Sequence, residues 1–323
     1  MSGPVVVLAG GTGGAKLARG MLDVVGGERL TVIANTGDDV ELYGAHVSPD
    51  PDLISFWLAD RIDARGWGLE GDTFNVMDGL RELGQEIWFN LGDRDLAIGV
   101  QRAAALAHGE RLTLSHAAIN TSLGVSAEVL PMSDQPVRTR VLADGRWWTL
   151  QEFLIQGRGQ GVIEDIQYRG ADAAAPTPEV LAALAGAATI VIGPSNPILS
   201  IGPILAVPGL RDAIVSSPAP VVAVSPLVGG AVLKGPTAAC MTWAGVPVSA
   251  AGLAELYGGL ADGLVCDEPA ALDDARGAAA APAVLIAPTL MDSSETRRGV
   301  AAATLDFATK LAPAASSSSV RRR

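Results

Sequence analysis

An apolar run, Val5 to Leu8, leads directly into a glycine-rich turn and then into a segment of helical character. The turn and the first helical residues include Gly10, Gly11, Thr12, Gly13, Gly14 and Lys16. The start of a helix leaves backbone N–H groups unpaired and carries a partial positive charge, so a phosphate placed there gains hydrogen bonds and dipole attraction. Glycine lets the backbone approach such a ligand closely. This junction therefore predicts a phosphate or nucleotide site formed by these residues.

Neither common phosphate-binding fingerprint fits the junction. The Walker pattern fails because Ala15 replaces the glycine before Lys16 and Leu17 replaces the Ser or Thr that would hold Mg²⁺. The dinucleotide pattern would require glycine at position 16. The sequence therefore favours neither an ATPase nor an oxidoreductase. The alternative to phosphate binding is a tight turn without a ligand, in which Lys16 points to solvent.

The charge and the residue usage exclude several classes of function. A formal net charge of −12 and a pI near 4.7 argue against binding to nucleic acid. Two cysteines and three histidines are too few for a disulfide scaffold, a thiolate zinc cluster or a histidine-rich metal centre. No basic leader or uninterrupted long apolar stretch is present, so we expect no membrane association and a cytoplasmic location.

Short β-branched runs alternate with Ala- and Leu-rich stretches, which is typical of an α/β fold with a parallel sheet flanked by helices. We expect strands at Val5–Leu8, Leu30–Ala34, Glu86–Phe89, Thr189–Ile192 and Val221–Val224. We expect a single domain spanning 1–310, with an inserted antiparallel and helical subdomain at roughly 126–170. Residues 311–323, rich in serine and arginine, are expected to be a disordered tail.

Acidic and polar residues follow the second expected strand. Asn35 and Thr36 come directly after it, and Asp50 and Asp52 lie a short distance further on. Mg²⁺ usually takes one or two carboxylates and completes its shell with waters and substrate phosphates. Asp50 and Asp52 are therefore candidate Mg²⁺ ligands. Asp-Gly and Asp-Pro combinations also form ordinary turns, so a structural role stays open.

Two further clusters come after expected strands. Asp93, Arg94 and Asp95 follow Glu86–Phe89, where the guanidinium could bind phosphate or a ring carbonyl while the carboxylates orient it. A solvated cluster of charges without function is the alternative. The second cluster, which follows Thr189–Ile192, contains Ser195, Asn196 and Pro197 and is typical of a ligand-binding rim. A proline-stiffened connection is the alternative there.

Six blocks, in matching order between about Val5 and Met291, resemble the CofD/FbiA transferases. The blocks are Gly10–Gly13, Asn35–Thr36, Ser48–Asp50, Leu91–Asp95, Leu130–Asp134 and Gly193–Pro197. The resemblance implies a Rossmann-like fold and a transferase of coenzyme F-420 biosynthesis. Such an enzyme moves a three-carbon phosphate unit from a guanosine diphosphate-linked donor to the ribityl hydroxyl of the deazaflavin precursor Fo and releases GMP. The donor carries lactyl in archaeal members and enolpyruvyl in bacterial ones.

The resemblance also implies roles for individual residues. The loop from Gly10 to Gly14 would hold the donor phosphates, with Mg²⁺ on Asp50 or Asp52 as the expected cofactor. Asp52 could instead accept the hydroxyl proton, and Arg94, oriented by Asp93, would contact Fo or the phosphoryl group.

At the other end of the donor, Ser195 and Asn196 would line the guanosine. The high Ala and Gly content points to a bacterial source, hence to the enolpyruvyl donor.

The alternative function, the oligomeric state and the position of the acceptor ring are considered next to the resemblance. A regulator that binds nucleotide-sugars without catalysis belongs to the same superfamily and is the alternative function. We expect a homodimer because the apolar content is high for the length of the chain. The tricyclic ring of Fo needs an apolar slot, but Trp57, Trp67 and Phe74 are left unassigned because aromatic residues at such spacing usually belong to a core.

Overall fold

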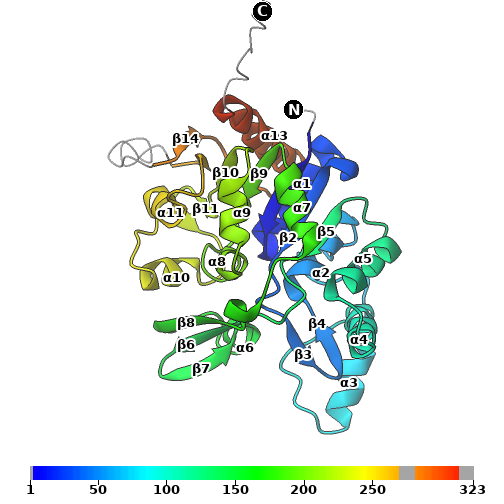
Figure 1. Cartoon of the computed structure of the whole chain (residues 1–323). Coiled ribbons are helices and arrows are strands. Elements are labelled where there is room, and N and C mark those ends of the chain that lie inside the picture. The colour runs from blue at the N-terminus through cyan, green and yellow to red at the C-terminus, as the bar shows by residue number, and fades with distance from the viewer. Residues whose placement is uncertain (1–2, 269–280, 313–323) are drawn as a thin grey trace, which may run out of the picture.

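Seven parallel strands form the central sheet of the computed structural model, which describes residues 3–268 and 281–312 (Figure 1). Their order across the sheet is β14, β13, β10, β9, β1, β2, β5. The bounds are β1 Val5–Ala9, β2 Leu30–Ala34, β5 Glu128–Pro131, β9 Thr189–Ile192, β10 Val221–Val224, β13 Gly263–Cys266 and β14 Ala283–Ile286. The predicted parallel α/β fold is confirmed.

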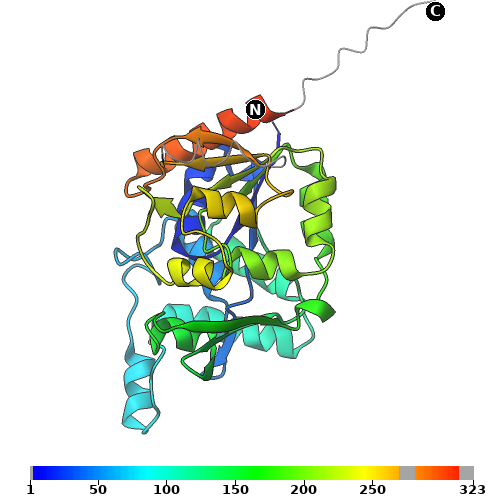
Figure 2. The same ribbon diagram turned by 90° about the vertical axis from the view of Figure 1, so that its left-hand side faces the viewer.

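Helices cover both faces of this sheet (Figures 1 and 2). Side chains of β1 alternate between the two resulting cores. Val5 and Val7 pack with α1 (Gly11–Val25) and α13 (Ser294–Leu311), whereas Val6 and Leu8 face the opposite core. That second core contains residues of α7 (Pro178–Gly186), α8 (Ile201–Ala206), α9 (Leu210–Ser216) and α11 (Ala250–Leu256). A strand buried on both faces explains the unbroken apolar run of β1.

The chain order reverses beside β1, and this reversal determines where a ligand can bind. From β1 the chain proceeds outward through β2 and β5, then returns to β9 on the other side of β1 and continues through β10, β13 and β14. In open parallel sheets, the crevice at such a switch point, beyond the carboxyl ends of the strands, is the usual ligand site. Gly10 follows β1 there, and Gly193 follows β9.

Two smaller structural units lie beyond the carboxyl ends of the central strands, in the lower half of Figure 1. One contains the hairpin β3 (Val40–Leu42) and β4 (Ala45–Val47), together with α3 (Asn75–Glu82) and α4 (Asp93–Ala107). The other is an antiparallel sheet of β6 (Arg138–Ala143), β7 (Arg146–Thr149) and β8 (Ile163–Arg169), with α6 (Leu150–Ile155). In Figure 2, α3 projects away from the body of the protein.

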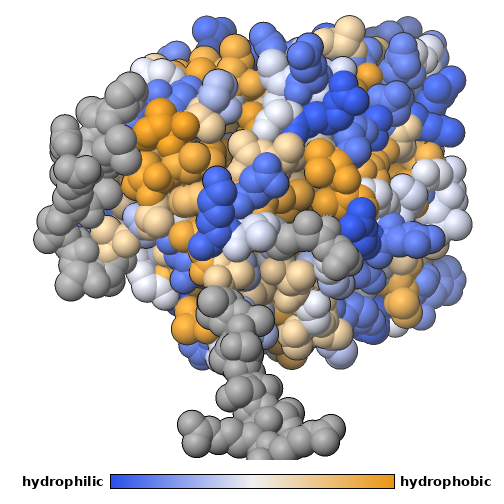
Figure 3. Space-filling view, turned by 90° about the horizontal axis from the view of Figure 1, so that it is seen from above, coloured by the Kyte–Doolittle hydropathy of each residue, from blue (hydrophilic) through white to orange (hydrophobic). Residues whose placement is uncertain are grey.

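The remaining elements connect these units. They are α2 (Pro49–Leu58), α5 (Leu112–Leu123), α10 (Thr237–Trp243), the hairpin β11 (Leu227–Val228) and β12 (Ala231–Val232), and the 3-10 helices Gly27–Arg29 and Ala171–Ala173. None of the helices in the described residues is long and apolar enough to cross a membrane. The opposite end of the molecule, where the central strands begin, has apolar groups scattered among hydrophilic ones (Figure 3).

The structure corrects two sequence-based expectations. Glu86–Phe89 is not a strand: it is an irregular link between α3 and α4, and Ile87 and Phe89 pack on a small local core. Apolar content at this position reflects that core rather than the central sheet. Residues near 126 do not begin the insertion either, because β5 pairs in parallel with β2 and belongs to the central sheet. The predicted disordered tail, 311–323, is wrong at Leu311, which is the last residue of α13, and from 313 onward it lies outside the described residues.

Candidate active site

A cavity of about 980 Å³ opens at the switch point of the sheet. Its walls come from the loops after β1, β9 and β10, from the first turns of α1 and α6, and from the segment that precedes α13. The predicted site residues that line it are Gly10, Gly11, Thr12, Gly13, Lys16, Asp50, Ser195 and Asn196. The structure therefore brings together the glycine loop, one acidic residue and the Ser195 loop.

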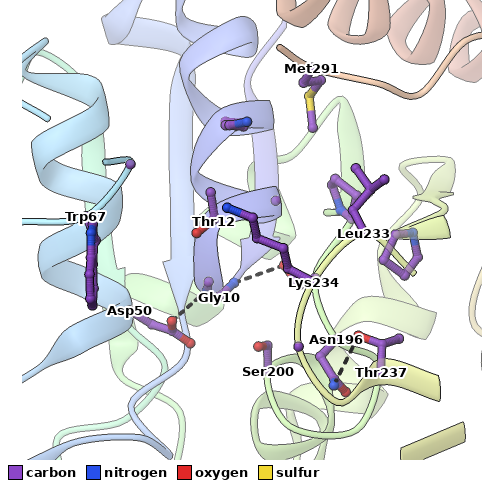
Figure 4. Close-up of a pocket in the computed structure, with 18 of the residues that line it drawn as sticks. Gly10, Thr12, Asp50, Trp67, Asn196, Ser200, Leu233, Lys234, Thr237 and Met291 are labelled. Carbon is purple, nitrogen blue, oxygen red and sulfur yellow. Dashed lines mark hydrogen bonds between the residues drawn. The ribbon is translucent and has the colours of Figure 1, made fainter. Parts of the chain in front are cut away.

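The carboxylate of Asp50, a residue in the first turn of α2, lies at the N-terminus of α1 (Figure 4). Its Oδ1 accepts a hydrogen bond from the Gly11 amide at 2.5 Å, and its Oδ2 accepts one from Asn35 Nδ2 at 2.9 Å. Gly10 donates its amide to Ser195 Oγ at 3.1 Å. Two amides at this helix start are thus satisfied by a hydroxyl and a carboxylate, which are groups that a phosphate oxygen can replace.

The glycines of this loop serve two separate structural purposes. A Cβ on Gly13 would collide with the carbonyl of Pro194, and one on Gly14 would collide with Ser195 and Ala9. These two glycines therefore let α1 pack tightly on the β9 loop. Gly11 instead has open space around its Cβ position and a φ of 61°, so it is the glycine of this loop that leaves room for a ligand.

Three buried carboxylates gather beside this helix start. Burial, and then the charges of Asp50 and Asp39, raise the pKa of Asp38 well above its ordinary value. Burial also raises the pKa of Asp50 to about 6, although hydrogen bonds from Asn35 and Gly11 oppose the shift. Gln151 Nε2 donates to Asp38 Oδ2 at 3.2 Å, while Asp38 Oδ1 and Asp39 Oδ1 are buried without a hydrogen-bond partner in the structure. Buried oxygens without a partner are unusual and fit a position for a cation or an incoming hydroxyl.

Cationic side chains line another wall of the cavity. Lys16, Lys234 and Arg297 all reach it. The pKa of Lys16 is lowered, first by burial and then by the charges of Arg297 and Lys234. The Arg297 guanidinium lies 5.1 Å from the centroid of the Trp57 ring, and Lys16 Nζ lies 6.0 Å from it. Mutually repelling cations around a helix start form an environment that an oligophosphate would stabilise.

Asp52 lies outside the cavity lining. Both its carboxylate oxygens accept from the guanidinium of Arg102, which is fully buried and also donates to the carbonyl of His46 at 2.9 Å. His116 lies next to this pair, and burial followed by the charge of Arg102 lowers its pKa to about 3, so its ring is neutral. The pair joins the first turn of α2 to α4. A chemical role for Asp52 stays a prediction, and its position indicates an anchoring role.

Asp93 caps a helix instead of orienting Arg94. Its carboxylate accepts from Thr73 Oγ1 at 2.6 Å and from the amides of Asn75 and Val76 at the start of α3, and these bonds lower its pKa to about 2. Asp72 in turn accepts from the amide of Arg94 at the start of α4. The Arg94 side chain is exposed and is not among the cavity-lining residues. The two acids thus hold α3 and α4 together.

The remaining predicted residues lie around the rim or behind it. Asn196 Oδ1 accepts from the amides of Ile198 and Leu199 at 2.9 Å, and its Nδ2 donates to Thr237 Oγ1 at 3.3 Å (Figure 4). Pro197 and Thr36 do not line the cavity. Thr36 is buried behind it, and its hydroxyl oxygen has no partner in the structure.

Four residues that line the cavity are not among the site residues predicted from the sequence: Asp38, Lys234, Arg297 and Thr237. Lys234 and Thr237 follow β10 and the small hairpin after it, so the rule that ligands bind beyond parallel strands could have found them. Arg297 sits in the first turns of α13, far along the chain, and no local motif marks it. Its place in the site comes from the packing of α13 beside α1.

Comparisons with known proteins identify the family. A family model described as 2-phospho-L-lactate transferase CofD matches residues 5–305. A 2-phospho-L-lactate transferase from Methanosarcina mazei is 38% identical over 298 residues, 92% of this chain and 98% of that protein. A phosphoenolpyruvate transferase from Thermobifida fusca is 39% identical over 322 residues, 95% of this chain and 98% of that protein.

Among solved structures, a member of the UPF0052 family from Bacillus halodurans has a TM-score of 0.59 at 19% identity, covering 94% of this chain and 99% of that one. This likeness concerns the fold. The fold and the cavity define an α/β protein whose cavity, lined by a helix start and by cationic side chains, lies at the switch point of its sheet. The chain belongs to the CofD family, so the resemblance drawn from the six blocks is confirmed. It is a transferase of coenzyme F-420 biosynthesis.

The buried Asp52–Arg102 pair gives a stability prediction. Asp52→Asn leaves the Arg102 charge buried without its counter-ion, so we expect the free energy of unfolding to fall by about 3–5 kcal/mol in urea titrations. The double variant Asp52→Asn with Arg102→Met removes both charges and should recover part of that loss. A single variant that keeps the wild-type unfolding midpoint but loses turnover would contradict the anchoring role and support the chemical one.

Asp50 gives a prediction of pH dependence. Its pKa is about 6 in the folded chain, against an ordinary value of about 3.9 in the unfolded chain. Between these values the folded state binds more protons, so this carboxyl lowers stability as pH rises from about 4 to 6. The free energy of unfolding of the wild-type chain should fall between pH 4 and pH 7 through this group. In Asp50→Asn the fall should be smaller by about 2–3 kcal/mol, as measured by urea unfolding at both pH values.

The matched control for that experiment is Asp78→Asn, because Asp78 is an exposed acid on α3. It should leave the pH dependence of stability unchanged. If Asp50→Asn shows the same pH dependence as the wild-type chain, Asp50 does not titrate as its buried position requires.

Proposed function

We propose that this chain transfers the enolpyruvyl-phosphate group of enolpyruvyl-diphospho-guanosine to the ribityl hydroxyl of Fo, releasing GMP and giving dehydro F-420-0. Family membership supports the class of reaction, and relatives named for both phosphoenolpyruvate and 2-phospho-L-lactate transfer match at similar identity. We choose the enolpyruvyl donor over the lactyl donor because the high Ala and Gly content indicates a bacterial source.

One observation carries the proposal: a helix start with an open Gly11 position stands between buried carboxylates and a group of cations. The amides of α1 and the side chains of Lys16, Lys234 and Arg297 can hold the two phosphates of the donor. Phosphoryl transfer depends mainly on positioning and on neutralising charge spread over the phosphoryl oxygens. This arrangement supplies both.

The guanosine end of the donor is assigned to the β9 loop. Asn196 and Thr237 lie together on that wall of the cavity, and Ser195 joins the loop to the Gly10 amide. Asn196 is held by hydrogen bonds within the protein, and the Thr237 hydroxyl, which accepts from it, can still donate to a base edge or a ribose oxygen. The acceptor hydroxyl then has to approach the phosphorus from the side of the cavity opposite the leaving GMP.

The residues present fit a Mg²⁺ ion. Across the described residues, no three acidic, histidine or cysteine side chains are arranged to hold a metal ion by themselves. One or two carboxylates are sufficient when the substrate supplies phosphate oxygens, and Asp38 offers a buried carboxylate oxygen without a partner. We therefore propose Asp50 and Asp38 as the residues that would hold Mg²⁺, in preference to Asp52, whose oxygens both bind Arg102. The bound ion would neutralise charge on the phosphoryl oxygens.

Asp93 and Arg94 receive no part in this transfer. The carboxylate of Asp93 is used by the start of α3, and Arg94 projects from α4 outside the cavity lining. Buried carboxylates beside an anion site favour an enzyme over a regulator, because a protein that only bound nucleotide would gain nothing from this repulsion.

The direct test of the proposal is a transfer assay. Purified chain, Mg²⁺, Fo and enolpyruvyl-diphospho-guanosine should give a more anionic fluorescent product on ion exchange and an equal amount of GMP. The lactyl donor should react more slowly. Binding of the donor without any product would support the non-catalytic regulator instead.

A second prediction concerns the cationic wall. Arg297→Ala should weaken GDP binding about tenfold or more in isothermal titration calorimetry, because it removes a charge-assisted contact to the diphosphate. Arg298→Ala is the matched control, since Arg298 is the next residue of α13 and is exposed. It should change the affinity by less than about twofold. Equal GDP affinities for the two variants would remove Arg297 from the phosphate site.

A further inference from the structure

Trp67 exposes a large aromatic surface to the cavity. Its side chain lines the cavity, and the residue is 59% exposed. Figure 4 places Trp67 on the Asp50 side of the cavity, across from Leu233 and Lys234. Leu233, which is 60% exposed, also lines the cavity. Large apolar groups left exposed inside a concave site indicate a ligand with an apolar body.

A short hairpin fixes the position of Trp67. The Glu70 amide donates to the Arg61 carbonyl at 2.8 Å, and the Asp63 amide donates to the Gly68 carbonyl at 3.0 Å. Ile62 and Leu69 form an antiparallel bridge between the same two arms. The ring is therefore presented by a hydrogen-bonded turn of defined shape.

The guanidinium of Arg65 packs against the Trp67 ring. Arg65 Nε donates to Asp63 Oδ1 at 2.6 Å, which fixes the guanidinium. That guanidinium lies 5.9 Å from the centroid of the Trp67 ring and 5.7 Å from that of Phe74. Cation–π contacts at such distances are attractive and restrict the orientation of the ring. A preoriented ring loses less entropy when a ligand stacks on it.

The other two aromatic candidates are already engaged. The Trp57 ring has Lys16 and Arg297 over it and packs on the core between α1 and the sheet. Phe74 packs on the small core around Met77 and Leu91 and does not line the cavity. Of the three, Trp67 is the one that both lines the cavity and is an exposed residue.

We propose that Trp67 is the specificity-determining platform on which the flat ring system of the acceptor stacks. The inference rests on the proposed function, which puts the guanosine on the Asn196 wall and brings the acceptor to the diphosphate from the opposite side. Trp67 stands on that opposite side (Figure 4). Its apolar face suits a tricyclic deazaflavin, and the nearby Asp50 and Asp38 carboxylates leave the ribityl chain a polar path to the phosphorus.

The test is a binding titration that needs no turnover. Fo is fluorescent, so its binding to the whole chain can be followed by the change in its emission. Trp67→Ala should weaken Fo binding about tenfold or more, and Trp67→Phe should restore most of it, because stacking on one aromatic ring contributes that order of affinity. Trp88→Ala is the matched control, since Trp88 stacks on Phe89 away from the cavity and should leave Fo binding unchanged.

Measurements with GDP separate the remaining outcomes. GDP affinity should stay within about twofold in Trp67→Ala, because the diphosphate and the base lie elsewhere. If Trp67→Ala binds Fo as well as the wild type, or if it loses GDP affinity equally, the platform is overturned even when transfer is observed. If Fo binding depends on Trp67 but no product forms with either donor, the platform stands and the proposed transfer fails.

Discussion

The hydrogen bond from the Gly11 amide to the Asp50 carboxylate is the interaction on which the site depends. The first amides of α1 have no partner within their own helix, and the sequence places no capping side chain at Gly10. The chain resolves this by bringing an acid from the first turn of α2 to the start of α1. The same arrangement buries Asp50 beside Asp38 and Asp39, which raises its pKa. A phosphate can compete for the amide, while the acids keep an affinity for a cation.

The position of α2 is in turn fixed by buried charge. Arg102 reaches from α4 to both oxygens of Asp52 and to the carbonyl of His46, so one guanidinium connects α2, α4 and β4. Buried ion pairs contribute little net stability compared with apolar packing. Removing one partner, however, leaves an uncompensated buried charge and strongly destabilises the fold. We interpret this pair as the anchor that fixes the first turn of α2, and with it Asp50, against α1. Asp52 thereby acts on the site through geometry.

Local sequence patterns predicted the central parts of the molecule and failed where tertiary packing decides. The β-branched run before the glycine loop predicted β1 and the start of α1, because a doubly buried strand and a helix start have distinct local signatures. The strand predicted at Glu86–Phe89 was wrong because the apolar residues of this segment pack on a small local core. Periodicity alone does not distinguish such a segment from a strand. The short strands β13 and β14 were missed.

The same limit applies to the site. Gly10, Gly11 and Ser195 line the cavity because they follow strands that meet at the switch point, and Asp50 reaches it from the first turn of α2. Asp93 and Arg94 looked equivalent in sequence, yet the structure uses Asp93 to cap α3 and leaves Arg94 outside the cavity lining. Arg297 and Trp67 come from distant segments that are brought to the cavity by packing and by one short hairpin. No local motif could assign them.

The proposed transfer requires a diphosphate to bind at the start of α1, between the buried carboxylates and the cationic wall. The most direct measurement is a crystal structure of the chain grown with GDP and Mg²⁺. We expect phosphate oxygens within hydrogen-bond distance of the Gly11 amide and next to Lys16, with the metal ion on the Asp50 side. A nucleotide that binds with its diphosphate away from both Gly11 and Asp50 would contradict this expectation.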